Sequence, residues 1–294
     1  MIRHLLVSAT GLASDANLLA GAFDLARPFS AHVDVLHVRR NPRRDLSLYS
    51  EGISPEKIET IIKEAERNAA EATAVARRMF DQAVANASIP VDDKAGRGER
   101  VTAEWREVFG QDTRIVAAEA RFADLVVLSR PDGTSIELDI PEGILFESGR
   151  PVLLAGGDMA RLDSIAIAWD GGRPAVRAVA GALDFITRAT KVTILVVEGR
   201  PMNAVAALVA DRPDPRPERL VDHLAWHGVH ASVRMIPRDG RTVGEALAET
   251  SEELNVGLLV MGAYGHSRFR ETILGGATRH MLANPIGRPV LLAH

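Results

Sequence analysis

One seven-residue segment occurs twice in this chain, at residues 149–155 and again at residues 287–293. Both copies read Gly-Arg-Pro-Val-Leu-Leu-Ala. Three further pairs of strand-like segments match in the same order: Leu5–Val7 with Ile165–Ile167, Val33–Leu36 with Val192–Leu195, and Leu125–Leu128 with Leu258–Met261. An ordered series of matches indicates a duplicated domain, and 294 residues suit two domains of about 150. We therefore predict one domain at 1–158 and a second at 159–294.

The second half alternates short apolar runs with segments of helical periodicity. The predicted strands are Ser164–Trp169, Val192–Val197, Val229–Ile236, Gly257–Met261 and Pro289–Ala293. The predicted helices are Pro174–Thr190, Glu218–His227, Thr242–Leu254 and Glu271–Ala283. Thr242 and Glu245 have the spacing of a capping box at the start of one helix. Strands separated by helices favour parallel pairing with right-handed crossovers, and apolar runs without alternation suit strands covered on both faces.

The first half repeats this plan with changes. Its predicted strands are Leu5–Ala9, His32–Val38, Val101–Val108, Leu125–Ser129 and Pro151–Ala155. A long helix is predicted over Pro55–Ala87, with Ser54 as its N-cap and an apolar stripe made by Ile58, Ile61, Ile62 and Ala65. The predicted fold class is α/β, with two tandem doubly wound domains, each built on a mainly parallel five-stranded sheet.

Composition excludes several classes of function. A chain without cysteine has no disulfide, thiol nucleophile or Cys-ligated metal, and it fits the reducing cytoplasm, where we expect this protein. No apolar run reaches the ~18 residues of a membrane span. A net charge of −4 argues against broad nucleic-acid binding. His223 and His227 have i,i+4 spacing, but no neighbouring Glu completes a zinc-protease pattern, and we predict no metal site.

A glycine-rich stretch in the second half has the pattern of an anion site. Gly262 and Gly265 follow a predicted strand directly, and Gly275 and Gly276 lie near the start of the next helix. Glycines allow close approach of the backbone to a ligand, and unpaired N–H groups at a helix start favour phosphate. Loops beyond the carboxyl ends of parallel strands bind ligands in open α/β sheets. Three side chains near this loop add donors: His266, Arg268 and Arg270.

At this stretch the chain resembles the universal stress protein family in its tandem two-domain form. The nucleotide signature of that family is Gly, two residues, Gly, nine residues, Gly, then Ser or Thr. Gly262, Gly265 and Gly275 match it, and Gly276 stands where the hydroxyl residue is expected. Thr278, two positions later, is a second candidate for that hydroxyl. The resemblance implies Rossmann- or flavodoxin-like domains.

The resemblance also implies where a nucleotide binds. Asp170, after the first strand of the second half, matches an acidic position that faces adenine or ribose, although a turn or cap role is also open to it. Val197 matches a position that packs near the base. The implied nucleotide-binding residues are Ala168, Asp170, Val197, Met261, Gly262, Tyr264, Gly265, His266, Gly275, Gly276, Ala277 and Thr278.

The first half has lost these features. Thr10 stands where Asp170 stands, and Ser-Arg-Pro-Asp at 129–132 replaces the glycine pattern of 262–265. Pro131 also removes a backbone donor where a phosphate would need one. Ser129 and Gly149 are 20 positions apart in the first half, whereas Gly262 and Gly287 are 25 positions apart in the second. We therefore expect no nucleotide site in the first half.

These observations favour a regulatory, stress-response protein that binds ATP, with any Mg²⁺ carried by the phosphates. We expect it not to be an enzyme beyond weak ATP hydrolysis. Two alternatives stay open: an ATP-hydrolysing or adenylyl-transferring enzyme with His266 as its base, and an interaction scaffold that binds no nucleotide. We further expect the near-identical strands at 152–155 and 290–293 to pair the two halves as an internal pseudo-dimer, since unpaired apolar edges are a liability. A homodimer is a further possible assembly.

Overall fold

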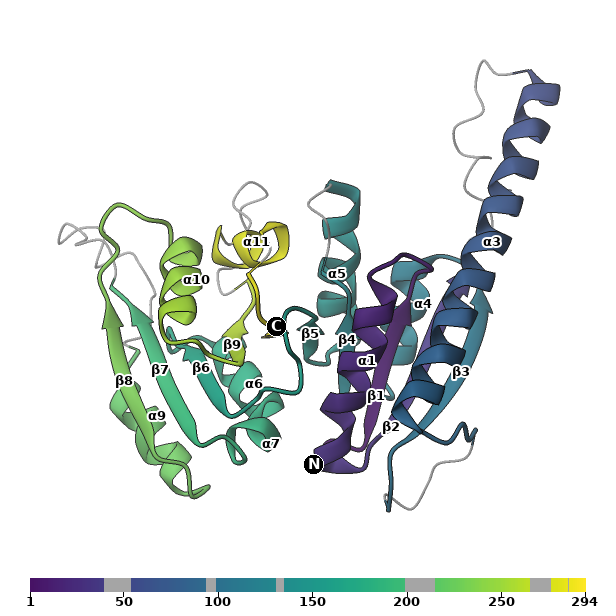
Figure 1. The fold of residues 1–294 in the computed structure, drawn as a ribbon. Coiled ribbons are helices and arrows are strands. Elements are labelled where there is room, and N and C mark those ends of the chain that lie inside the picture. The colour runs from purple at the N-terminus through teal and green to yellow at the C-terminus, as the bar shows by residue number, and fades with distance from the viewer. Residues whose placement is uncertain (40–53, 94–98, 131–134, 199–214, 265–275, 285) are drawn as a thin grey trace. The chain divides into compact units, whose positions relative to one another are not determined.

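The structure is a computed structural model that describes residues 1–39, 54–93, 99–130, 135–198, 215–264, 276–284 and 286–294. Its internal contacts divide it into two compact units. The first comprises Ile2–Ser129, and the second comprises Met1 together with Arg130–His294. Each unit is an α/β body with its own buried core, as the sequence predicts (Figure 1).

The Ile2–Ser129 unit contains four parallel strands in the order β3-β2-β1-β4. The strands are β1 (His4–Ala9), β2 (His32–Arg39), β3 (Thr102–Phe109) and β4 (Leu125–Leu128). The helices are α1 (Asp15–Ala26), α3 (Pro55–Ala87) and α4 (Asp112–Ala120), with a short 3₁₀ helix at Arg27–Phe29. Central β1 is buried on both faces, which explains its unbroken apolar run.

Helix α3 has the predicted bounds and the predicted N-cap. The Ser54 side chain accepts a hydrogen bond from the Lys57 N–H, and Pro55 fills the first turn. The predicted apolar stripe is only partly right, because Ile61 is 41% exposed while Ile62 is buried. The buried residues of the later turns are Ala76, Phe80 and Val84, and the Phe80 ring centroid lies 5.6 Å from that of Trp105 on β3.

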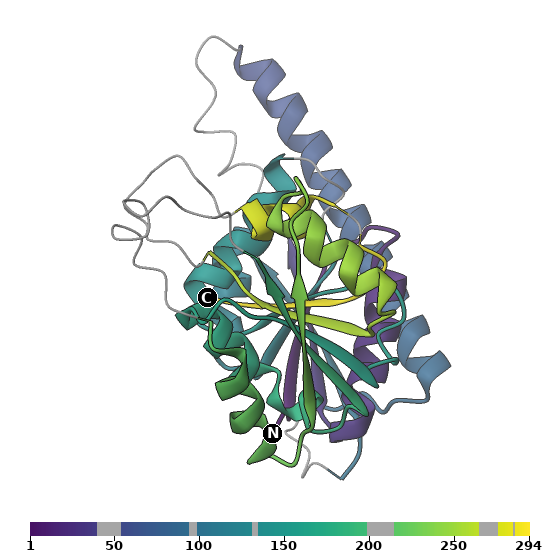
Figure 2. The same ribbon diagram turned by 90° about the vertical axis from the view of Figure 1, so that its left-hand side faces the viewer.

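The Arg130–His294 unit contains six strands in the order β5-β10-β9-β6-β7-β8. The strands are β5 (Val152–Leu154), β6 (Ser164–Ala168), β7 (Lys191–Val197), β8 (Ala231–Ile236), β9 (Leu258–Gly262) and β10 (Val290–Ala293). The helices are α5 (Ser135–Ser148), α6 (Arg173–Gly181), α7 (Leu183–Ile186), α9 (Pro217–Ala225), α10 (Val243–Glu253) and α11 (Gly276–Ala283). All pairs are parallel except β5 with β10, and α9 and α10 lie on opposite faces of the strands (Figure 2).

Two local predictions for this unit have different outcomes. The capping box of α10 is confirmed, since Glu245 N donates to Thr242 Oγ1 at 3.2 Å and Thr242 N donates to the Glu245 carboxylate at 2.7 Å. The single helix predicted over 174–190 is wrong: α6 ends where Ala182 adopts φ −97° and ψ 0°, and the short α7 follows. The boundary between the two sequence repeats at residue 158 stays a prediction. No helix in the described ranges is long and apolar enough to cross a membrane.

Candidate functional site

The carboxyl ends of neighbouring strands bring three of the predicted nucleotide residues together. Ala168, the last residue of β6, pairs with Met261 on β9 and with Leu195 on β7. Gly262 follows Met261 and pairs with Ala293 on β10. This is the edge of a parallel sheet at which open α/β folds bind ligands. Val197, which ends β7, is half-buried and pairs with the last residue of β8.

Gly262 is required by the packing of α6 against β9. A Cβ atom on Gly262 would lie 2.4 Å from the backbone N of Ala175 and 2.6 Å from the carbonyl carbon of Pro174. Real Cβ atoms do not approach backbone atoms this closely. The first turn of α6 therefore lies directly against the end of β9. The sequence assigned this glycine to ligand approach, whereas the structure shows helix approach as a sufficient reason for it.

Asp170 organises the turn that leads into α6. Its Oδ1 accepts a hydrogen bond from the Gly172 N–H at 2.8 Å, and Gly171 between them has a φ of +74°. Gly172 is the N-cap of the helix, and the Asp170 side chain is exposed. The turn role that the sequence left open for Asp170 is thus observed. The turn places the exposed Asp170 carboxylate two residues beyond Ala168.

Tyr264 connects the end of β9 to the first turn of α11. Its backbone N–H donates to Thr278 Oγ1 at 3.2 Å, and Thr278 is only 2% exposed. Its hydroxyl donates to the carboxylate of Glu142 on α5. The Tyr264 backbone has a φ of +55°, which is uncommon for a residue other than glycine. The Thr278 hydroxyl oxygen therefore already has a partner within the fold.

Among the described residues, none has a heavy atom within 4 Å of a Cβ atom built on Gly276, the first residue of α11, and Gly276 itself is exposed. Ala277 follows in the same turn and is half-buried. The predicted residues Gly265, His266 and Gly275 lie outside the described residues.

The corresponding edge of the first unit is filled by side chains of that unit. Asp15, which is fully buried, accepts hydrogen bonds from the backbone N–H groups of Thr10 and Gly11 at 2.8 and 2.7 Å and from the Thr10 hydroxyl at 3.1 Å. Burial raises the pKa of Asp15, and these three hydrogen bonds oppose that rise. Sequence reasoning missed Asp15, although an acidic residue at the first position of a helix was a visible signal.

Helix α3 passes close to the same edge. A Cβ atom on Gly11 would lie 2.5 Å from the carbonyl oxygen of Ala72, and His37 Nε2 lies 3.0 Å from the Thr73 hydroxyl. The Nδ1 atom of His37 lies 2.9 Å from the carbonyl oxygen of Ala9, at the end of β1. Residues of this unit thus occupy the region beyond β1 that corresponds to the region beyond β6.

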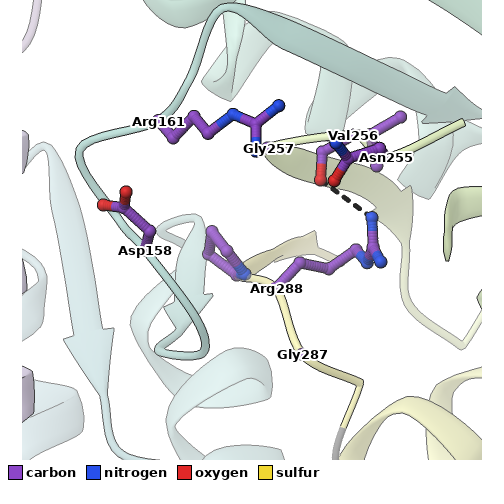
Figure 3. Close-up of a pocket in the computed structure, with 8 residues that line it drawn as sticks. Asp158, Arg161, Asn255, Val256, Gly257, Gly287 and Arg288 are labelled. Atoms are coloured by element: carbon purple, nitrogen blue, oxygen red, sulfur yellow. Dashed lines mark hydrogen bonds between the residues drawn. The ribbon is translucent and has the colours of Figure 1, made fainter.

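A cavity of about 90 Å³ opens at the opposite edge of the second unit, before β9 and β10 (Figure 3). Its wall includes Asp158, Arg161 and Arg288. The Arg288 guanidinium donates through Nη1 to the carbonyl oxygens of Val256 and Ser251 at 2.8 and 2.6 Å. Burial lowers the pKa of Arg288. Because these contacts join chain segments at the amino ends of the strands, the cavity is distinct from the predicted nucleotide edge.

No cluster of three or more His, Asp or Glu residues that could hold a metal ion occurs in the described part of the chain. The His223 and His227 rings lie 5.1 Å apart in an edge-to-face arrangement.

Comparison with known proteins identifies the second half. Residues 162–292 match the sequence model of the Universal stress protein family. This segment of 131 residues is therefore similar to universal stress proteins. No curated protein is similar enough to the chain to count as a match.

Solved structures extend the likeness to the whole chain. A universal stress protein from Archaeoglobus fulgidus DSM 4304 is 18% identical, with a TM-score of 0.62 over 99% of this chain and 95% of its own. A protein of Pseudomonas aeruginosa UCBPP-PA14, solved as a candidate universal stress protein, is 14% identical. Its TM-score is 0.53, and the match covers 99% of this chain and 93% of that protein. At these identities the likeness shows a common fold over the full length of the chain.

Proposed function

We propose that this protein is a tandem universal stress protein that binds ATP in its C-terminal half. The observation that carries the proposal is the carboxyl edge of β6 and β9, where the first turn of α6 lies against Gly262 and the first turn of α11 is bonded to Tyr264. Two helix starts are thereby placed near one strand end. Unpaired N–H groups and the helix dipole favour phosphate at such positions.

The residues at this edge fit an adenine nucleotide. No heavy atom in the described part of the chain lies within 4 Å of a Cβ atom on Gly276, and on this basis we propose that a phosphate approaches the first N–H groups of α11. The exposed carboxylate of Asp170 can accept hydrogen bonds from ribose hydroxyls or an adenine amino group. Ala168 and Met261 offer a small and an apolar surface beside it. ATP supplies the triphosphate and the chelating oxygens that would carry Mg²⁺.

The contacts at the corresponding edge of the first half support the proposal of one nucleotide site per chain. Asp15 and the backbone of Ala72 occupy the region beyond β1, and Thr10 takes the place of Asp170. The site that the second half offers is therefore filled from within in the first half. We propose a regulatory role in a stress response in the cytoplasm, with catalysis limited to weak ATP hydrolysis at most.

Two measurements test ATP binding. Nucleotide that copurifies with the protein is read by absorbance after denaturation. Calorimetry with ATP is expected to show one site per chain, and ATP at 100 times its Kd should raise the free energy of unfolding by about 2.7 kcal/mol. Two equivalent sites per chain, or no heat and no stabilisation, would contradict the proposal. Turnover that His266→Ala abolishes would instead favour the enzyme alternative.

A charge variant locates the site. Gly276→Asp places a carboxylate in open space at the start of α11, where it suits the helix dipole but repels phosphate. We expect it to fold normally and to weaken ATP binding by at least about tenfold. Gly287→Asp is the matched control, because a Cβ atom there also meets no heavy atom of the described residues within 4 Å, and Gly287 lies before β10, at the other edge. Equal losses in both variants would argue against the C-terminal location.

A further inference from the structure

The end of β9 is held by a residue of the first sequence repeat. Glu142 belongs to α5, which precedes the first copy of the repeated segment, and its carboxylate accepts the hydrogen bond of the Tyr264 hydroxyl. Both residues lie in the same compact unit. The contact spans 122 positions of sequence.

Aromatic packing supports the same contact. The Phe146 ring, one turn after Glu142, lies 4.7 Å from the Tyr264 ring and 4.6 Å from the His294 ring. His294 Nδ1 lies 3.1 Å from the carbonyl oxygen of Ala263, the residue before Tyr264. Ring pairs at these separations add stability beyond the area they bury. Helix α5 thus holds the side chain of Tyr264, and His294 contacts the backbone just before it.

The backbone conformation of Tyr264 explains why it needs such contacts. A φ of +55° is unfavourable for a side chain of this size and persists only where the surroundings fix it. The same residue donates its N–H to Thr278 in the first turn of α11. The position of Tyr264 therefore affects the first turn of α11, which is proposed to face phosphate.

A second residue of the first repeat holds the other end of α11. The Arg130 guanidinium donates to the carbonyl oxygens of Met281, Asn284 and Arg288, the latter two at 3.3 and 3.2 Å. Burial lowers the pKa of Arg130 to about 10, so it remains a cation at neutral pH. A cation at the C-terminal end of a helix is stabilising. In the repeat alignment Arg130 lies in the loop that replaces the glycine-rich loop.

We propose that Glu142 is a positioning residue for the nucleotide site of the second repeat, acting through Tyr264 on the first turn of α11, with Arg130 as a second anchor at the far end of that helix. The inference rests on the proposed function. The first repeat has lost its own glycine pattern, and residues from its last segment contact Tyr264 and the C-terminal end of α11 in the second repeat. Affinity for ATP in the second repeat therefore depends on α5 through Tyr264.

The test compares ATP affinity and local opening in Glu142→Ala, Tyr264→Phe, the double variant and Glu142→Gln. Each of the first two is expected to raise the Kd for ATP about three- to tenfold, and the double variant no further, because both remove one hydrogen bond. Glu142→Gln keeps an acceptor oxygen and should restore most of the affinity. Glu147→Ala is the control, since Glu147 is an exposed carboxylate on the same helix.

Hydrogen exchange without nucleotide provides the second readout. Amides at 261–264 and 276–283 should exchange faster in Glu142→Ala and Tyr264→Phe, while those of α10 should not change. Unchanged exchange, or faster exchange with wild-type ATP affinity, would overturn the positioning role. Additive losses in the double variant would do the same. A wild type that binds no ATP would overturn the proposed function, and the exchange data would still decide whether Glu142 holds Tyr264 and the first turn of α11.

Discussion

Leu153 and Leu291 are direct partners at the centre of the antiparallel β5–β10 pair. They occupy the same position in the repeated seven-residue segment, and both are fully buried. The flanking pairs are Leu154 with Val290 and Val152 with Leu292. Two identical edges that pair about a local two-fold axis form an isologous contact, in which each covers the other. This register is what the internal pseudo-dimer requires, and we retain that assembly as a proposal.

Truncation at either leucine should destabilise the protein to a similar extent. Leu153→Ala and Leu291→Ala are each expected to lower the free energy of unfolding by about 2–5 kcal/mol, because each leaves a cavity in a buried core. Since the residues are partners, the double variant should depart from additivity by about 0.5–3 kcal/mol. Urea denaturation measures the free energy of unfolding of the two single variants and of the double variant.

Leu12→Ala is the control for this cycle, because Leu12 is 59% exposed and should change stability by no more than about 0.5 kcal/mol. Strictly additive losses from Leu153 and Leu291 would show that the two side chains do not depend on each other.

Much of the fold could be predicted from local sequence patterns. Unbroken apolar runs located β1, β6 and β9 to within a residue or two, because strands covered on both faces carry no polar alternation. Ser54 with Pro55 fixed the start of α3, since capping is a local interaction. The repeated segment indicated strands that now prove to be paired with each other.

The parts that could not be predicted depend on contacts between distant segments. Nothing near Glu142 in the sequence indicates that it meets Tyr264, and nothing near Gly262 indicates the approach of α6. Asp15 was overlooked because its role depends on a loop that folds back over it. The glycine pattern gave the location of the candidate site, but only the coordinates separate glycines needed for helix packing from those beside open space.

Gly262→Ala should destabilise the protein even without a ligand. The new methyl group would lie 2.4 Å from Ala175 N, and both nearest neighbours are backbone atoms that cannot rotate away. Overpacking of this kind costs about 1–3 kcal/mol. Urea denaturation in the absence of nucleotide measures it, with Gly276→Ala as the control in open space. If the urea midpoint of Gly262→Ala is unchanged, α6 can move to accommodate the methyl group. Loss of ATP binding in variants with larger side chains at Gly262 would then reflect obstruction of the nucleotide site.

Arg106→Met should be strongly destabilising in a pH-dependent way. The Asp34 side chain is 4% exposed, and Arg106 donates to it through Nε at 2.9 Å and through a second nitrogen. Burial alone would raise the pKa of Asp34, but contacts with His4 and Arg106 outweigh it and hold that pKa below its ordinary value. Asp34 therefore contributes stability above its unfolded pKa of about 3.9, and this is lost as pH falls through the lower folded pKa.

Without Arg106 the contact between His4 and Asp34 remains, but burial is opposed by fewer favourable contacts, so the pKa of Asp34 in the folded variant should lie above that in wild type. Breaking one buried pair in this way costs about 3–5 kcal/mol at pH 7. The deficit relative to wild type should shrink as the pH falls from 7 to about 3.5, because Asp34 takes up a proton at higher pH in the folded variant than in wild type. Urea midpoints across that range measure it. Arg67→Met, which removes an exposed pair with Glu71, should cost no more than about 1 kcal/mol at any pH.

Gly276→Ser should increase the preference for ATP over ADP. The family signature places a hydroxyl residue at this position, and a Cβ atom built there meets no heavy atom of the described residues within 4 Å. A neutral hydrogen bond to the terminal phosphate would contribute about 0.5–1.5 kcal/mol, which is up to about a tenfold change in the ratio of the two Kd values. Thr278 is not expected to replace that hydroxyl, because it is buried and its Oγ1 accepts the hydrogen bond from Tyr264 N. Thr278→Ala should therefore weaken ATP and ADP alike. Calorimetry with both nucleotides measures the ratio, and loss of discrimination in Thr278→Ala, with none gained in Gly276→Ser, would show that Thr278 contacts the phosphate.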